Sequence, residues 1–220
     1  MQTKTLDLQE EILEQLAFDP RVSSDDIAVT VQEGVVTLRG TVPSFHEKWE
    51  AEDVVKRVRG VRGLVDEMAI DLPALHVRND TDIALALQHR FDSSTVIPST
   101  ITFDVNRGHV TMSGEVAWHY QATEAVNEAK AVVGVKDIVN LIRVKPAKSP
   151  SADEIVKRIH GALARTADLE AQRIHVTVAG SLVTLSGSVR SWFERDNAGQ
   201  AAWSIPGVTH VDNRIAVNAW

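Results

Sequence analysis

The sequence predicts an α+β protein made of three tandem α-β-β-α-β units, each a three-stranded mixed sheet with two helices on one face. The first observation is a repeated motif, Gly-Val-Val-Thr-Leu-Arg-Gly at 34–40, which recurs in altered form at 108–114 and 181–187. Its closing glycines are Gly40, Gly114 and Gly187, so the period is 74 and then 73 residues. The second observation is that the same order of hydrophobic periods surrounds each motif, four-residue spacing for helices and strict alternation for strands.

Each unit is expected to open with a helix. Apolar residues four apart share one side of a helix and would face the sheet. They are Leu8, Ile12 and Leu16; Ile83, Leu87 and Phe91; and Ile155, Ile159 and Leu163. Asp80 and Ser151 are the predicted N-caps of the second and third of these helices.

A β-hairpin should follow each opening helix. Alternating apolar residues predict its first strand: Ile27, Val29 and Val31; Ile101, Phe103 and Val105; and Ile174, Val176 and Val178. A glycine turn leads to the second strand, at Val35–Val42, Val110–Val116 and Leu182–Val189, with Ser181 in the place of Gly34. Gly40, Gly114 and Gly187 lie inside that strand, where glycine marks a close approach, and we expect a helix to cross there.

A second helix follows, with a capping-box signature in two units. Ser44 with Glu47, and Ser191 with Glu194, have the Ser-x-x-Glu spacing, whereas the second unit has Trp118 and Gln121 at these positions. Gly60, Gly134 and Gly207 are predicted C-cap glycines of these helices.

The unit closes with a third strand, reached through the helix and therefore expected to pair in parallel. Asp66, Asn140 and Asn213 occupy one repeat position before its apolar residues, where a short polar side chain suits a turn or strand-entry bond. The predicted units are residues 1–75, 76–148 and 149–220, with linkers near 73–79 and at 145–150.

Composition limits the function classes. The 220 residues carry a net charge of −7 and contain no cysteine, which excludes disulfides and thiolate metal sites. The acidic excess lies in the first unit, so no nucleic-acid partner is expected. The chain shows no apolar run long enough for a membrane span and no secretory signal at its start. A cytoplasmic location is therefore expected, or a periplasmic one if a signal has been removed.

At this point the chain resembles the BON domain family, named for bacterial osmotically induced and nodulation proteins. The resemblance rests on the Val-Thr-Leu-x-Gly strand, on Gly60-Val61, Gly134-Val135 and Gly207-Val208 twenty residues later, and on the endings Val139-Asn140 and Asn213-Arg214-Ile215. It covers nearly the whole chain, and Asp66 departs from the family's asparagine. The resemblance implies no catalytic residues, and an association with osmotic stress, phospholipid membranes and contacts between envelope proteins.

The sequence contains no clear catalytic or metal-binding motif. His46 and Glu50 share a helix face but lack the second histidine of a zinc helix, and Glu47 is better read as a capping residue. We therefore expect no catalytic residue, no metal and no cofactor, and predict that the protein is not an enzyme.

Two sets of residues are candidates for binding. Aromatic residues recur at the start of each second helix, and they could pack internally, join units, or form an external surface for a protein or a lipid: Phe45, Trp49, Trp118, Tyr120, Trp192 and Phe193. The basic cluster Lys56, Arg57, Arg59 and Arg62 fits a solvated helix end or an anion contact. The expected function is a binding or scaffold role in osmotic or envelope stress through an unidentified protein partner; peripheral phospholipid binding is the alternative.

Overall fold

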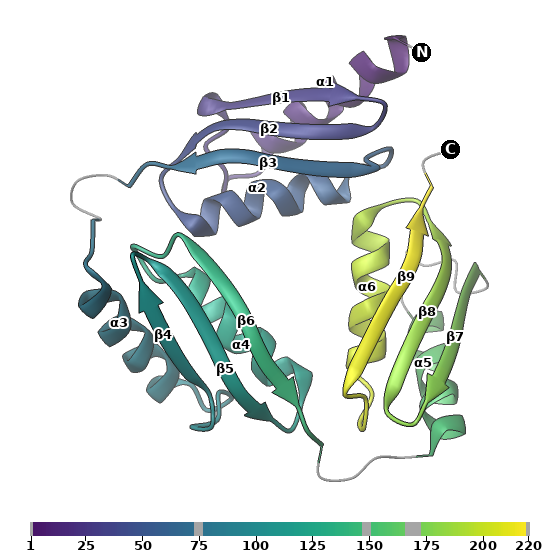
Figure 1. The fold of residues 1–220 in the computed structure, drawn as a ribbon. Helices are drawn as coiled ribbons and strands as arrows, with labels where there is room; N and C mark the ends of the chain where they lie inside the picture. The colour runs from purple at the N-terminus through teal and green to yellow at the C-terminus, as the bar shows by residue number, and fades with distance from the viewer. Residues whose placement is uncertain (1, 73–76, 147–150, 166–172, 219–220) are drawn as a thin grey trace.

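A computed structural model describes residues 2–72, 77–146, 151–165 and 173–218 of the chain. Its units repeat one order of elements (Figure 1). The first contains α1 (Gln2–Phe18), β1 (Ile27–Gln32), β2 (Val35–Val42), α2 (Phe45–Arg57) and β3 (Gly63–Ile70), with a short 3₁₀ turn at Ser24–Asp26. The second unit contains α3 (Asp80–Ser93), β4 (Thr102–Asn106), β5 (His109–Val116), α4 (His119–Lys130) and β6 (Asp137–Val144). The third unit contains α5 (Ala152–Arg165), β7 (Ile174–Ala179), β8 (Leu182–Val189), α6 (Trp192–Trp203) and β9 (His210–Val217). The predicted α+β class and element order are confirmed; the predicted linkers lie partly outside the described residues.

Each sheet has its second strand in the middle. β1 pairs antiparallel with β2, and β2 pairs parallel with β3; the same holds for β4-β5-β6 and β7-β8-β9. The hairpin turns differ in their glycine position. Glu33 and Gly34 both have positive φ, 51° and 83°, as a type I′ turn requires, whereas in the third unit Gly180 takes the first central position with φ 63°, as in type II′.

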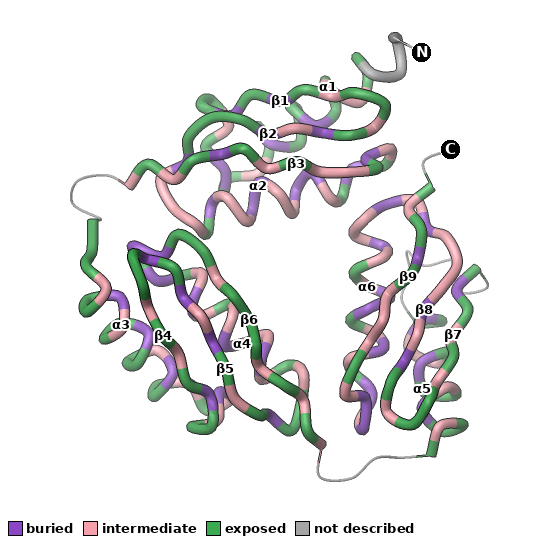
Figure 2. Tube along the Cα trace, in the orientation of Figure 1, coloured by how far each residue is buried: buried purple, intermediate pink, exposed green. Residues whose placement is uncertain are grey.

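Each unit has its own hydrophobic core between the sheet and its two helices. Alternate strand residues such as Val36 and Leu38 are fully buried against Ile12 and Leu16 of α1. Figure 2 shows this alternation, with buried and exposed residues following one another along the strands. The opposite face of each sheet is largely exposed and includes apolar residues such as Val35, Val65 and Leu141. Both helices of a unit therefore cover the same face, as the sequence predicted.

The strand glycines are required for a different reason from the one expected. A Cβ built on Gly114 would lie 2.3 Å from the carbonyl oxygen of Thr100, the residue before Ile101, and the equivalent carbonyls are 1.8 Å away at Gly40 and 2.0 Å away at Gly187. The predicted helix crossing is therefore wrong. The hairpin's own backbone approaches the glycine as it enters the first strand, and φ at Gly114 is 137°, which favours glycine as well.

Helix ends also differ from the predictions at several residues. The N-cap of α3 is Asn79, which accepts the Asp82 N–H at 2.9 Å, so the assignment to Asp80 was wrong. The Asp80 carboxylate instead accepts the N–H groups of Arg107 and Gly108 at 2.8 and 2.9 Å, joining α3 to the β4–β5 hairpin. Ser151 is confirmed as a cap, since its hydroxyl accepts the Glu154 N–H at 3.4 Å.

Gly60, Gly134 and Gly207 lie beyond the helix ends, so they are not C-caps. The C-caps are Val58, Ala131 and Ser204. Gly134 has φ 98°, and the Val135 N–H donates to the Val132 carbonyl at 3.3 Å. Positive φ at the third position of a four-residue turn defines type II, so these glycines shape the connection from helix to strand.

The capping boxes form only in part. Ser44 and Ser191 each accept the N–H three residues later at 3.1 Å. The partner carboxylates bind elsewhere: Glu47 accepts the Ser23 N–H at 2.5 Å and thereby holds the loop between α1 and β1, and Glu194 accepts the N–H of Arg190, the residue before the cap, at 2.8 Å. In the second unit the Gln121 side chain accepts the N–H groups of Ala117 and Trp118, both at 3.1 Å.

A short polar side chain protects the edge strand of every sheet. Asp66, Asn140 and Asn213 each accept the backbone N–H two residues later, at 2.9, 3.0 and 3.3 Å. The predicted local bond exists, but it lies within β3, β6 and β9 rather than at their entry. Satisfying an edge N–H in this way reduces the chance that another strand pairs with it.

Candidate binding surface

The aromatic start of α2 packs against the second unit. Phe45 contacts the hydrophobic core of that unit. One turn later the Trp49 ring lies 3.5 Å from the Nζ of Lys130, the last residue of α4. The junction thus joins the start of α2 to the end of α4 by apolar contact and a cation–π contact.

The other junctions repeat this pattern. The start of α6 meets α2, because Trp192 packs against the core of the first unit and the Phe193 ring lies 5.9 Å from the Arg57 guanidinium carbon. The start of α4 meets the end of α6, where His119 stacks on Trp203 with ring centroids 4.1 Å apart and planes 11° apart. The second helices therefore form a closed ring, start to end, which corresponds to the middle of the molecule in Figure 1.

Charged groups in these junctions are partly withdrawn from water. Burial lowers the pKa of Lys130 to about 8, partly offset by the acidic side chains of Glu50 and Asp53. Burial also raises the pKa of Asp196 on α6 above its ordinary value. Glu50 itself is buried and pairs with Arg21 at 2.5 Å, so it stabilises the first unit rather than presenting a free carboxylate.

Trp118 and Tyr120 differ from the other candidate aromatics. They are 41% and 58% exposed, whereas Phe45, Trp49, Trp192 and Phe193 are half-buried at junctions. Their rings stack on each other with centroids 6.5 Å apart and planes 28° apart. At the start of α4, therefore, a pair of aromatic side chains faces solvent.

A hollow of about 420 Å³ adjoins this pair, between the second and third units. The second unit contributes the start of α4 and Val96, and the third unit contributes the end of α6. The lining residues are Val96, Trp118, His119, Tyr120, Thr123, Glu124, Gln200, Trp203 and Ser204. Its volume is in the range of small-molecule sites, and four of its nine lining residues carry aromatic rings.

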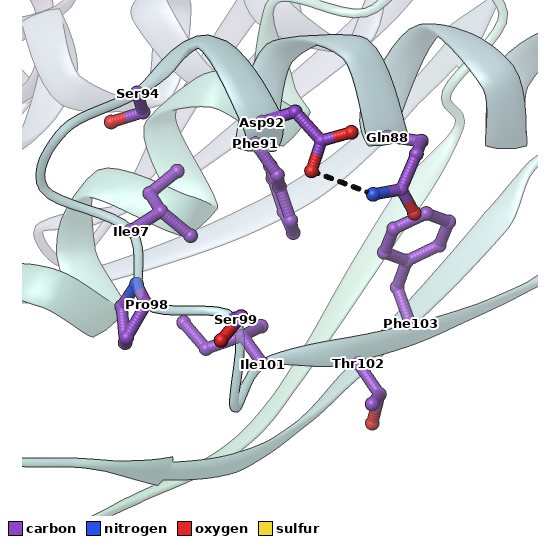
Figure 3. Close-up of a pocket in the computed structure, with 10 residues that line it drawn as sticks. All are labelled: Gln88, Phe91, Asp92, Ser94, Ile97, Pro98, Ser99, Ile101, Thr102 and Phe103. Carbon is purple, nitrogen blue, oxygen red and sulfur yellow. Dashed lines mark hydrogen bonds between the residues drawn. The ribbon is translucent and has the colours of Figure 1, made fainter.

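A second hollow, of about 580 Å³, lies within the second unit between the end of α3 and the start of β4. Figure 3 shows Phe91 and Phe103 meeting edge to face on one side, with ring centroids 5.5 Å apart. On the rim, Gln88 donates a hydrogen bond to Asp92 at 2.9 Å. Its floor consists of core residues of the unit, so we assign it to packing of the α3–β4 connection.

The basic cluster is not a uniform cationic patch. Lys56 pairs with Glu52 at 3.1 Å and Arg57 pairs with Asp53, each one helical turn away. Arg59 and Arg62 are exposed, and Arg62 covers Gly34 with its aliphatic stem. Two of the four charges are therefore compensated, which weakens an anion site here.

His46 lies 3.8 Å from Glu50, but Glu50 already binds Arg21. Within the described residues, no group of three or more His, Asp or Glu side chains is arranged to hold a metal ion. Within the same residues, no helix is long and apolar enough to cross a membrane.

Sequence reasoning missed the partners of the aromatic residues. Trp203 and Lys130 occupy one repeat position, twelve residues past the N-cap of their helices, with Lys56 at the same place in α2. Aligning that position in the three units would have indicated a second set of large side chains at the helix ends. The pairing of starts with ends depends on how the units dock, which no local pattern encodes.

Comparison with known proteins identifies relatives of the repeated unit. The model of the BON domain matches residues 5–71, 79–146 and 151–219. Osmotically-inducible protein Y of Escherichia coli (strain K12) is 32% identical over 136 residues, which is 56% of this chain and 64% of that protein, just under two thirds of its length. An uncharacterised protein in the gshII 5′ region of Anaplasma centrale is 28% identical over 127 residues, covering 56% of this chain and 83% of that protein. The structure of CdsD, a structural protein of the type III secretion system of Chlamydia trachomatis, aligns over 96% of this chain and 92% of its own at 16% identity, with a TM-score of 0.27 that supports no inference.

Proposed function

This chain belongs to the BON domain family, in three tandem copies, and we propose that it is a non-enzymatic scaffold that contacts a protein partner through its second unit. The name of the osmotically inducible relative supports a role in osmotic stress. The proposed compartment is the cytoplasm, which fractionation of cells carrying the tagged protein would test; recovery from the periplasm would contradict it.

The observation that carries the proposal is the exposure of Trp118 and Tyr120. Rings near the starts of α2 and α6 are used to join units, but this pair at the start of α4 faces solvent. Trp and Tyr are enriched among the residues that dominate protein–protein binding energy, and exposed apolar groups that adjoin one another mark such sites. A partner that covers both rings would withdraw them from water, as the aromatic residues at the internal junctions are partly withdrawn.

A phospholipid surface is the less favoured partner. The net charge of the chain is −7, and two of the four residues of the basic cluster are already paired. A basic residue near an anionic bilayer contributes only about 1 kcal/mol, so the surface offers little attraction to such a membrane. Amphipathic rings also favour membrane–water interfaces, so lipid vesicles are included in the experiment below.

The test is cross-linking and affinity capture after an osmotic upshift, with wild type compared with the Trp118→Ala/Tyr120→Ala variant. The matched control is Leu85→Ala, because Leu85 is 65% exposed on α3 of the same unit. We expect one set of captured proteins to disappear in the double variant and to remain in the control. Flotation with anionic vesicles at physiological salt, lost in the double variant, would favour the lipid alternative; capture unaffected by either variant would refute the proposed surface.

A further inference from the structure

The hollow between the second and third units has an aromatic wall contributed by both. Trp118 and Tyr120 come from the start of α4, and Trp203 comes from the end of α6, where it stacks on His119. The faces of such rings carry negative electrostatic potential and attract cations, most strongly in the case of tryptophan. Three rings of this kind border a hollow of about 420 Å³.

The charge of the residues that line the hollow also favours a cation. Of the described residues that line the hollow, Glu124 is the one with a full charge, and it forms no ion pair with any described residue. Arg90 of α3 lines a neighbouring hollow together with Glu124, but its guanidinium is held by Glu128 at 2.7 Å, one helical turn from Glu124. Burial lowers the pKa of His119, so this ring is neutral near pH 7 and adds no positive charge.

We propose that this hollow binds a small organic cation of the quaternary ammonium type, with a trimethylammonium group against Trp118, Tyr120 and Trp203 and its charge balanced by Glu124. Methyl groups around a diffuse positive charge suit an aromatic wall, whereas a small inorganic cation would need several oxygen ligands. The inference goes beyond the proposed partner contact, because it needs Trp203 and Glu124 as well as the exposed pair.

The composition of the site predicts its selectivity. Choline and tetramethylammonium carry a positive charge and no carboxylate. A zwitterion such as a betaine brings a carboxylate close to Glu124, and the lining contains no lysine or arginine to receive it. We therefore expect a betaine to bind roughly tenfold more weakly than choline, because its carboxylate and that of Glu124 repel each other at a separation of a few ångströms.

Occupancy of the site should also strengthen the junction between the units. The ligand contacts residues of α4 and α6 together, so it binds only while these helices are docked. A ligand that binds the docked form alone shifts the equilibrium toward it by mass action. Choline should consequently slow hydrogen exchange at the end of α6.

The experiment is a titration of the full chain with choline, tetramethylammonium and a betaine at constant ionic strength, followed by the indole N–H signals of the five tryptophans. Saturable shifts are expected for Trp118 and Trp203, with Trp49 and Trp192 unchanged as internal references. Glu124→Gln and Trp203→Ala should each weaken choline binding roughly three- to tenfold. Asp104→Asn is the matched control, because it removes an exposed carboxylate of the second unit that does not line the hollow, and it should leave the affinity unchanged.

A parallel arm separates a free cation from a lipid headgroup. Flotation with phosphatidylcholine vesicles, lost in Glu124→Gln, would identify the headgroup as the source of the cation, whereas soluble choline binding without flotation identifies a free metabolite. Absence of a Glu124-dependent response in both arms would overturn the proposal. Partner capture that needs Trp118 and Tyr120 but not Glu124 would leave the proposed scaffold function standing.

Discussion

Substitution of Gly114 by alanine should remove much of the stability of the second unit, because the new side chain would collide with the backbone. The new Cβ would lie 2.3 Å from the Thr100 carbonyl oxygen and 3.0 Å from the Ile101 Cα, which are backbone atoms of the same hairpin. Neither can rotate away as a side chain could. The residue would also be held at φ 137°, a region that L-residues avoid.

The expected magnitude follows from these two costs. Unfavourable backbone conformation costs about 1–3 kcal/mol, and overpacking costs typically another 1–3 kcal/mol. A domain of this size derives roughly 3–5 kcal/mol from its core, so the substitution removes a large part of it. A domain of 60–100 residues loses about 4–8 °C in Tm for each kcal/mol, which predicts a fall on the order of 10 °C or more.

Hydrogen exchange resolved by unit is the appropriate assay, because it separates β5 from its counterparts β2 and β8. Protection should fall in β4, β5 and β6 and should change less in the third unit. The control is Gly161→Ala in α5, where the nearest atom to the new Cβ is the flexible end of Arg165 at 3.5 Å. Alanine there should stabilise its helix by about 0.5–1 kcal/mol. Wild-type protection in Gly114→Ala would refute the argument from backbone contact.

Further predictions concern the junctions and pH. Trp192→Ala should free the third unit from the first, seen as faster hydrogen exchange in α2 and α6 with little change in the core of the second unit; equal loss in all units would contradict this. Hydrogen bonds from Arg107 and Gly108 lower the pKa of Asp80 below its ordinary 3.8, so its contribution to stability is present above that value and is lost as the pH falls below it. In acid titrations Asp80→Asn should therefore flatten the pH dependence of unfolding of the second unit, and an unchanged slope would show that this carboxylate does not contribute.

The sequence predicted the helices and strands well, because each type of element has its own spacing of apolar residues along the chain. The alternating residues Ile27, Val29 and Val31 share one face only if the segment is a strand. In the same way, Ile83, Leu87 and Phe91, spaced four apart, share one face only if the segment is a helix. Parallel pairing of the last strand follows from the helix that precedes it. These features need no knowledge of distant residues.

Predictions failed where the missing information was a neighbour in space. The glycine at position 114 indicated that there is no room for a side chain in this strand. The atom that occupies the space is the Thr100 carbonyl oxygen, and its position depends on the path of the loop before β4. The aromatic residues were found, but the sequence left open whether they join units or face solvent. Their assignment depends on which helix end each one meets, and Trp118 stays exposed although Trp192 at a neighbouring repeat position is covered.

The closed ring of second helices has a consequence for the order in which the protein is made. Synthesis proceeds from the N-terminus, so the first unit can fold long before α6 emerges. Until then the surface that receives Trp192 has no cover. A nascent chain, or a chain truncated before α6, therefore exposes an apolar patch on its first unit, and this patch is covered only when the third unit has folded. A chaperone or protease that recognises this patch would distinguish finished molecules from unfinished ones.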